Sequence, residues 1–289
     1  MRRSICGSLA ALCVLALSAQ VAMGVPLGLR SGGAARATLH SKRGVASARY
    51  LGSDPSKLSQ LGASWAYDWS ASAPPATAAL TWVPMISTAG SLTAATITQL
   101  QAAGRAGRVR YLLGFNEPDS AAQSNLTPQQ AAALWPQLER TGLILGSPAT
   151  ATPSDGWLAS FMALAQQRQL RIDFIALHYY QDFTNPNAVS ELRGQLVLLH
   201  NEYRRPIWIT EIGAFDIRSW HEPMTGTPTD ALAARYMRKL FAMLDALRFV
   251  QRYAWFTDDC WNDVACRFGS LFTAHGRTTL AGKTFMTAR

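Results

Sequence analysis

The chain has 289 residues and a formal net charge of +9, which falls to +7 once Arg2 and Arg3 leave with the leader described below. Its basic residues are scattered and mostly lie near predicted helix ends, which is typical of a solvated surface, so we expect no nucleic-acid partner. A weak attraction to anionic cell-wall polymers stays compatible with this charge. About 265 residues remain after the leader, which suits one large domain.

The start of the chain predicts a secretory signal peptide over residues 1–24. A basic head is followed by an apolar run from Ile5 to about Ala22, which ends in small residues such as Ala19 and Gly24. A membrane anchor is the alternative, but polar interruptions leave a run that would barely cross a bilayer. We expect a protein secreted to the extracellular space or periplasm after cleavage, a monomer with no membrane span in the mature chain.

Cysteine usage agrees with export. Cys6 and Cys13 leave with the signal peptide, so Cys260 and Cys266 remain, and in an oxidising compartment this pair predicts a disulfide. Two buried free thiols are the alternative. A zinc site is disfavoured because no histidines flank the pair. We expect neither a metal nor a cofactor.

From residue 42 to 289, after a Gly/Ala/Ser/Arg-rich leader over 25–41, short apolar runs alternate with amphipathic segments. The predicted strands are Gly44–Ala46, Ser64–Trp69, Leu80–Ile86, Tyr111–Asn116, Leu143–Ser147, Asp173–Tyr179, Ile207–Glu211 and Gln251–Thr257. The predicted helices are Pro55–Leu61, Thr93–Arg105, Pro128–Arg140, Gly156–Gln169, Val189–Tyr203, Thr229–Leu247 and Leu280–Met286. Ser70–Ala79 carries two prolines and is the weakest unit.

Eight strands, each followed by a crossover of about 30 residues per unit, predict the α/β class and a single (β/α)₈ TIM barrel over 42–289. An open doubly wound sheet is the alternative. That fold usually has a glycine-rich turn after its first strand, and none is found here.

Two glutamates stand at the carboxyl ends of predicted strands, where barrel active sites are built. Glu117 ends the fourth strand and precedes Pro118, which is expected to hold its backbone extended. Glu211 ends the seventh, 94 residues later, or three units of the repeat. We therefore expect the two side chains to converge across the mouth of the barrel. Either glutamate alone could equally be a surface or salt-bridged carboxylate.

Two facing carboxylates are what hydrolysis of a glycosidic bond requires. One protonates the leaving oxygen, and the other stabilises or attacks the cationic sugar carbon. The pair thus predicts a glycoside hydrolase. Other chemistries have little support, because the sequence has no Gly-x-Ser-x-Gly elbow, no His-Glu-x-x-His helix and no phosphate-binding glycine loop.

The Asn-Glu-Pro triplet at Asn116–Pro118, together with Glu211, resembles the large clan of retaining barrel glycosidases. More narrowly, the chain resembles glycoside hydrolase family 128 from about Lys42 to Phe285. Four segments carry this resemblance: Leu113–Asp119, Leu145–Ala149, Asp173–Tyr180 and Ile207–Gly213.

The resemblance implies a retaining β-1,3-glucanase with a β-glucan oligo- or polysaccharide as its substrate. Glu117 would be the acid/base and Glu211 the nucleophile. Asn116 would hold the sugar hydroxyl next to the scissile bond. His178 and Tyr180 would border the cleavage site, with Tyr180 donating a hydrogen bond to Glu211, although His178 could also be a satisfied core histidine.

Aromatic residues are expected to bind the sugar rings. Trp65, Tyr67 and Trp69 alternate along the second strand and should share one side of it. Tyr67, Trp69, Trp82 and Trp255 are the candidates, with Trp69 and Trp255 favoured because they lie near strand ends. The cysteine pair would stiffen the loop that carries Trp261.

Two alternatives stay open. A non-catalytic glucan-binding cell-wall protein would keep the aromatics but would not require both carboxylates. A related barrel hydrolase of β-1,4-mannan or β-1,4-glucan would keep both, because the two glutamates do not report the linkage.

Overall fold

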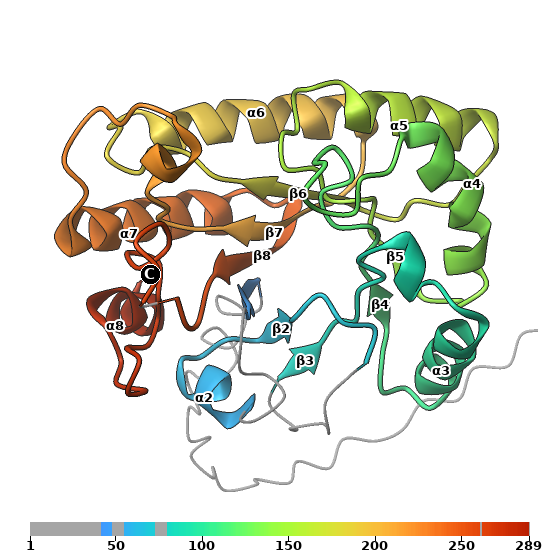
Figure 1. The fold of residues 1–289 in the computed structure, drawn as a ribbon, viewed down its shortest axis with the longest axis horizontal. Helices are drawn as coiled ribbons and strands as arrows, with labels where there is room; N and C mark the ends of the chain where they lie inside the picture. Colours follow the sequence, from blue (N-terminus) through green and yellow to red (C-terminus); the bar gives the residue numbers. More distant parts are fainter. Residues whose placement is uncertain (1–41, 48–54, 73–79, 261, 289) are drawn as a thin grey trace, which may run out of the picture. The chain divides into compact units, whose positions relative to one another are not determined.

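The computed structural model describes residues 42–47, 55–72, 80–260 and 262–288, all within one compact unit (Figure 1). The predicted signal peptide (1–24) and leader (25–41) lie outside these residues, as do Trp261 and most of the proline-containing part of Ser70–Ala79. Within the described part of the chain, no helix has the length and apolarity needed to cross a membrane.

The strands are parallel and form the centre of a mixed α/β fold. Six pair in the order β3-β2-β1-β8-β7-β6, and β4 pairs with β5. The strands are β1 (Arg43–Ala46), β2 (Trp65–Tyr67), β3 (Thr81–Trp82), β4 (Tyr111–Leu112), β5 (Ile144–Leu145), β6 (Ile175–Tyr179), β7 (Ile207–Ile212) and β8 (Val250–Phe256). The predicted α/β class with parallel strands is confirmed.

Single parallel bridges connect the two sheets. Met85, just after β3, pairs with Leu113, just after β4. Gly146, just after β5, pairs with Phe174, just before β6. A β-carbon on Gly146 would lie 2.4 Å from the Phe174 ring, so only glycine permits this approach.

Helices surround the strands in Figure 1. They are α2 (Pro55–Gln60), α3 (Ala94–Arg105), α4 (Pro128–Glu139), α5 (Trp157–Gln167), α6 (Ala188–Tyr203), α7 (Asp230–Ala246) and α8 (Leu280–Thr287), with short 3₁₀ turns η1 (Ala89–Ser91) and η2 (Ile217–Trp220). Thr93 and Thr127 cap α3 and α4 by accepting backbone N–H groups, as their positions before amphipathic segments predict.

The core has two layers because successive side chains on a strand point to opposite faces. On β7, Ile207 and Ile209 face the helices, whereas Trp208 faces the other side. There the Trp208 ring stacks on Phe174 with 4.1 Å between ring centroids, and Trp65 lies 5.4 Å away. Large aromatic side chains thus form the core on the face of the strands away from the helices.

Several strands are shorter than predicted. The third was expected to run from Leu80 to Ile86, but β3 ends at Trp82, since Pro84 has no N–H to continue the ladder. The second was expected to reach Trp69, but β2 ends at Tyr67, and Trp69 has a left-handed φ of 62°. Irregular backbone after β2 and β4 carries Trp69 and Glu117, whereas His178 and Glu211 lie on β6 and β7 themselves.

Candidate active site

Glu117 lies in the segment after β4, next to the bridge residue Asn116, in a conformation that the sequence did not predict. Its φ is 40°, so the expected extended backbone is wrong. The N–H of Glu117 donates to the carbonyl of Ala149 (2.8 Å), and its own carbonyl accepts from Ser120 in a turn (3.0 Å). These contacts stabilise a backbone conformation that is costly for a non-glycine residue, as is common at functional sites.

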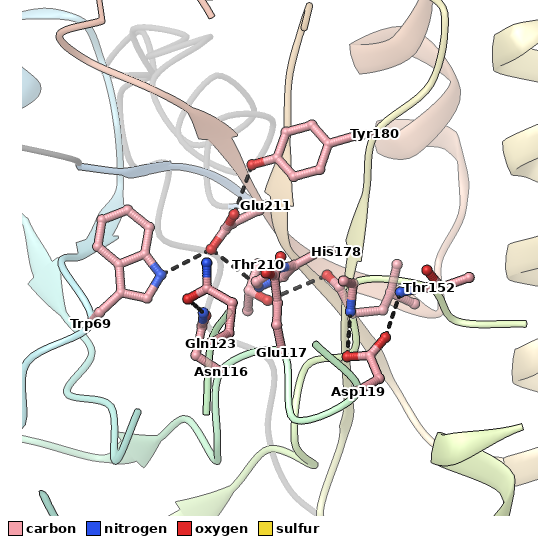
Figure 2. A network of polar contacts seen from close by, with 12 residues as sticks. Trp69, Asn116, Glu117, Asp119, Gln123, Thr152, His178, Tyr180, Thr210 and Glu211 are labelled. Carbon is pink, nitrogen blue, oxygen red and sulfur yellow. Dashed lines mark hydrogen bonds and ion pairs between the residues drawn. The ribbon is translucent and has the colours of Figure 1, made fainter. Parts of the chain in front are cut away.

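Glu211 lies within β7 and is only 5% exposed. Its Oε1 accepts from the indole Nε1 of Trp69 (2.9 Å) and from the hydroxyl of Tyr67 (3.1 Å), and its Oε2 accepts from the hydroxyl of Tyr180 (2.7 Å). Trp69 and Tyr180 approach this carboxylate from different sides (Figure 2). The Tyr180 hydrogen bond implied by the family resemblance is therefore present. Such donors stabilise the charged form of a buried carboxylate.

Glycine follows this strand at position 213, where a β-carbon would lie 2.4 Å from the carbonyl oxygen of Phe256. Any other residue would push β7 and β8 apart beside Glu211. The Ile-Gly pair at the end of the strand is therefore part of how the carboxylate is positioned.

His178 lies between the two glutamates. Its Nδ1 is 2.7 Å from Oε1 of Glu117, and its Nε2 is 3.3 Å from Oε1 of Glu211. One potential ligand atom from each of the three residues can be chosen so that all lie within 4.8 Å of one another. The predicted convergence of Glu117 and Glu211 is thus present in the structure, and His178, fully buried, connects them.

The carboxylates control the charge of His178. Burial by itself lowers the pKa of this imidazole, but the charge of Glu211 and the hydrogen bond to Glu117 raise it, with a further contribution from Asp119. The net pKa is raised above its ordinary value. The cationic form is therefore favoured between the two acids.

This shift predicts a pH-dependent contribution to stability. A raised folded-state pKa contributes stability that is fully present below the unfolded pKa of about 6.5 and is lost as the pH rises through the folded value. Wild type should therefore exceed His178→Asn in unfolding free energy by more at about pH 6 than at about pH 9. Urea unfolding of both proteins at the two pH values measures this; a difference that is constant or grows with pH contradicts it.

The two tyrosines that donate to Glu211 are themselves buried. Burial, followed by the charge of Glu211, raises the pKa of Tyr67 and of Tyr180 well above the ordinary value for a phenol. Both hydroxyls are therefore protonated donors at physiological pH.

Asn116 and Asp119 organise the loop after β4. The Nδ2 of Asn116 donates to Gln123 (3.3 Å), whereas its buried Oδ1 has no hydrogen-bond partner among the described residues. Asp119 accepts the N–H groups of Ala151 and Thr152 and so connects this loop to the one after β5. Burial raises the pKa of Asp119 despite these hydrogen bonds. No pattern in the sequence indicated these roles of Asp119 and Gln123.

Three of the expected sugar platforms are buried side chains. Trp255 is fully buried on the helix side of β8, where it meets Phe241 and donates to the carbonyl of Gly269 (2.7 Å). Trp82 is 8% exposed and also packs in the layer beneath the helices. Tyr67 does share one side of the chain with Trp65 and Trp69, but it is fully buried and contacts Glu211 by its hydroxyl.

An exposed aromatic group lies instead on the loop after β7. Trp220 is 47% exposed. Its ring stacks on that of Phe215 with 4.5 Å between centroids, and it meets the ring of Tyr180 edge to face with 5.6 Å between centroids. Phe256 lies 5.8 Å from Tyr180 on the same side. The sequence indicated only that this loop is long, because a loop has no periodicity from which side-chain direction can be read.

The predicted disulfide between Cys260 and Cys266 is present. The segment that it closes also supports the aromatic loop, since the N–H of Asp216 donates to the carbonyl of Ala265 (2.6 Å). Asp216 in turn caps η2 and binds the Arg218 guanidinium, which lowers the pKa of the carboxyl group.

Glu117, His178 and Glu211 are also the types of residue that could ligate a metal ion. However, both oxygens of Glu211 accept hydrogen bonds from uncharged donors, and the Nδ1 of His178 contacts Glu117. These donors would have to be displaced or turned away from a cation, so the arrangement favours proton transfer over metal binding.

A parallel α/β fold with two carboxylates converging at the ends of its strands defines the glycoside hydrolase class. The sequence model described as "Glycosyl hydrolase catalytic core" matches residues 44–285. The chain belongs to this family and, by its similarity to the solved structures described next, to glycoside hydrolase family 128. A search of curated protein sequences returned no match.

Three solved structures represent this similarity. The family 128 subgroup I endo-β-1,3-glucanase from Amycolatopsis mediterranei, in complex with laminaritriose, is 35% identical, with a TM-score of 0.75 over 86% of this chain and 100% of that one. The subgroup II endo-β-1,3-glucanase from Pseudomonas viridiflava is 33% identical, with a TM-score of 0.67 over 86% and 98%. The subgroup III curdlan-specific exo-β-1,3-glucanase from Blastomyces gilchristii, in complex with glucose, is 25% identical, with a TM-score of 0.66 over 85% and 97%.

Proposed function

We propose that this enzyme hydrolyses β-1,3-linked glucan with retention of anomeric configuration. The three solved relatives described above are all β-1,3-glucanases, and one of them holds laminaritriose. Nothing comparable supports the alternative β-1,4-mannan or β-1,4-glucan substrates.

The approach of Glu117 to Glu211 is the observation that carries the proposal. Potential ligand atoms of the two side chains lie within 4.8 Å of each other. Retaining glycosidases hold their carboxyl groups at about 5–5.5 Å, whereas inverting ones need about 6.5–9.5 Å to admit a water molecule. The geometry therefore favours direct attack by one carboxylate on the sugar.

The surroundings of each glutamate favour one division of roles. Glu211 carries several donors that stabilise its negative charge, as a nucleophile requires, so it attacks the anomeric carbon. Glu117 protonates the departing oxygen and later removes a proton from the attacking water. His178 contacts both Glu117 and Glu211, so a change of charge at one glutamate affects the other.

Asn116 would bind the substrate beside these acids. Its buried Oδ1 has no hydrogen-bond partner among the described residues, and a sugar hydroxyl would satisfy it. A hydrogen bond at this position can strengthen as charge develops in the transition state.

The strands are proposed to close into a (β/α)₈ barrel. Bridges from Met85 to Leu113 and from Gly146 to Phe174 supply the two junctions missing from the strand orders given above. With them, every strand has a neighbour on each side, and Glu117 and Glu211 extend from the same end of the barrel, as in this class of enzyme.

Secretion is part of the proposal. It rests on the charged and apolar start of the chain and on the Cys260–Cys266 disulfide, a bond typical of oxidising compartments.

Trp220 is proposed as a sugar platform in place of the buried tryptophans. Its exposed ring lies beside Tyr180, whose hydroxyl contacts Glu211, so a sugar next to the cleavage site would meet it. Stacking on an aromatic ring is worth about 1 kcal/mol, so Trp220→Ala should raise KM about fivefold with kcat nearly unchanged. Initial rates over a range of laminari-oligosaccharide concentrations measure both; an unchanged KM would remove Trp220 from the binding site.

Release of reducing sugar from laminarin, β-1,4-mannan and cellulose tests the function itself. We expect the wild type to release sugar from laminarin and not from the other two polymers. Release mainly from mannan or cellulose would overturn the proposed linkage. Binding to laminarin without release would favour a non-catalytic glucan-binding protein, which is the alternative of a different class.

A further inference from the structure

The two carboxylate oxygens of Glu211 accept different numbers of hydrogen bonds. Oε1 accepts hydrogen bonds from Trp69 and Tyr67, and the imidazole of His178 lies 3.3 Å from it. Oε2 accepts one hydrogen bond among the described residues, from Tyr180. A carboxylate oxygen has two lone-pair positions. Those of Oε1 are therefore taken, whereas Oε2 has one directed at no described donor.

Trp69 donates its indole N–H to Oε1 and to no other described acceptor. The Tyr67 hydroxyl has one proton and shares it between Glu211 and the carbonyl of Thr210, which lies 3.0 Å away. The indole N–H of Trp69 has a single acceptor at 2.9 Å. Removing this N–H should therefore change the hydrogen bonding of Oε1 more than removing the shared hydroxyl of Tyr67.

The backbone holds Trp69 in a direction that a regular strand would not give. Its φ is 62°, and the turn is fixed by Ser70, whose N–H and hydroxyl both donate to Asp68. The carbonyl of Ser70 accepts from Met85 (2.8 Å). The rings of Trp69 and Phe256 meet edge to face, with 6.1 Å between their centroids. The indole is thus a fixed donor, prepared before the substrate arrives.

We propose that Oε2 of Glu211 is the atom that attacks the sugar, and that Trp69 stabilises the negative charge on Oε1 when the covalent intermediate is hydrolysed. This inference rests on the proposed function and assigns atoms within it. Trp69 is then a positioning and charge-stabilising residue, in place of the sugar platform that its sequence position suggested.

The electron pairs follow from this assignment. In the first step a lone pair of Oε2 forms the bond to the anomeric carbon, the bond from that carbon to the leaving oxygen breaks, and Glu117 gives its proton to that oxygen. Oε1 becomes the carbonyl oxygen of a glycosyl ester. In the second step the oxygen of a water molecule attacks the anomeric carbon while Glu117 takes a proton from that water. The bond from the carbon to Oε2 breaks, and its electron pair returns to the carboxylate.

The indole N–H affects the two steps unequally. Negative charge leaves the carboxylate during the first step, so a donor to Oε1 does not accelerate it. Charge returns during the second step, so the same donor accelerates it, as an oxyanion-hole donor does. Loss of the N–H should therefore slow hydrolysis of the intermediate and spare its formation.

Trp69→Phe, which keeps an aromatic ring, tests this with 2,4-dinitrophenyl β-laminaribioside in a stopped-flow instrument. We expect kcat to fall about 100-fold, the order that loss of one such donor costs elsewhere, with kcat/KM changed less than about threefold. About one equivalent of dinitrophenolate per enzyme should appear as a burst, and intact-mass measurement should detect the glycosyl-enzyme. Equal losses of kcat and kcat/KM without a burst, or unchanged kinetics, would overturn the proposal.

Two further variants keep the result decisive. Tyr67→Phe removes the shared donor from the same oxygen, so kcat should again fall more than kcat/KM, but by a smaller factor. This variant tests the proposal if Trp69→Phe does not fold. Equal losses of kcat and kcat/KM in Tyr67→Phe would then count against it. Tyr180→Phe removes the hydrogen bond that orients the attacking oxygen Oε2, so it should lower kcat/KM without a burst. A burst with Tyr180→Phe and none with Trp69→Phe would assign the attack to Oε1.

The same measurements distinguish a failure of the proposed function from a failure of the role given to Trp69. A wild type that releases neither dinitrophenolate nor sugar from laminarin would refute the glucanase, whereas an active wild type with the wrong kinetic split refutes only the role of Trp69.

Discussion

Glu211→Ala should lower kcat/KM on laminarin by about 10⁴-fold or more, the order by which loss of a covalent nucleophile slows other hydrolases. The variant has no atom that can form the glycosyl ester, and the cavity that it leaves is lined by the donors Trp69, Tyr67 and Tyr180. An azide ion would fit this anion-binding cavity. With 2,4-dinitrophenyl β-laminaribioside and azide we therefore expect turnover to return with an α-glycosyl azide as product, measured by dinitrophenolate release and NMR.

A matched control for this variant is Glu191→Ala, which removes an exposed glutamate on α6 and should leave activity near that of the wild type. Residual activity of Glu211→Ala above a tenth of the wild type, or absence of any glycosyl azide, would contradict the assignment of the nucleophile.

Glu117→Ala should distinguish substrates by their leaving groups. Loss of general acid catalysis costs about 10²–10⁴-fold, and we expect a decrease of this size on laminarin, whose leaving oxygen needs a proton. Formation of the intermediate from the dinitrophenyl glycoside should be nearly unaffected, because dinitrophenolate leaves without protonation. Stopped-flow burst rates compared with steady-state release from laminarin measure the two effects.

Azide gives this variant a product of the opposite configuration. It should attack the glycosyl-enzyme from the face that Glu117 occupied in the wild type, which produces a β-glycosyl azide. An α-azide from Glu117→Ala, or equal losses on both substrates, would mean that the two glutamates have been assigned in the wrong order.

The positions of the two carboxylates could be predicted from the sequence because strand ends carry a strong signal. Each glutamate closes an apolar run, and in a parallel α/β fold the carboxyl ends of the strands meet at one edge. The spacing of 94 residues then matched three repeats of strand and helix. In the structure His178 contacts both acids.

The aromatic residues were harder to predict because a one-residue shift in register exchanges the two faces of a strand. On β8, Tyr253 and Trp255 pack beneath the helices, whereas Ala254 and Phe256 face the side of Trp69 and Tyr180. Position near the strand end favoured Trp255, but the alternation along the strand makes Phe256 the residue on the active-site side.

Irregular backbone accounts for the remaining differences. The left-handed conformation of Glu117 is stabilised by the hydrogen bond from its N–H to the carbonyl of Ala149, and that of Trp69 by the neighbouring bond from the N–H of Met85 to the carbonyl of Ser70. Both partners are distant in sequence. Local propensity argues against both conformations, so no reading of neighbouring residues would have predicted them. The direction of Trp69, and hence its contact with Glu211, follows from the tertiary structure alone.

The anomeric configuration of the first product tests the double displacement by Glu117 and Glu211 most directly. Proton NMR of a laminari-oligosaccharide digest, recorded within the first minutes before mutarotation, should show the β-anomer appearing first and the α-anomer growing later. Initial release of the α-anomer would mean that water attacks the sugar directly, and it would contradict the covalent role of Glu211.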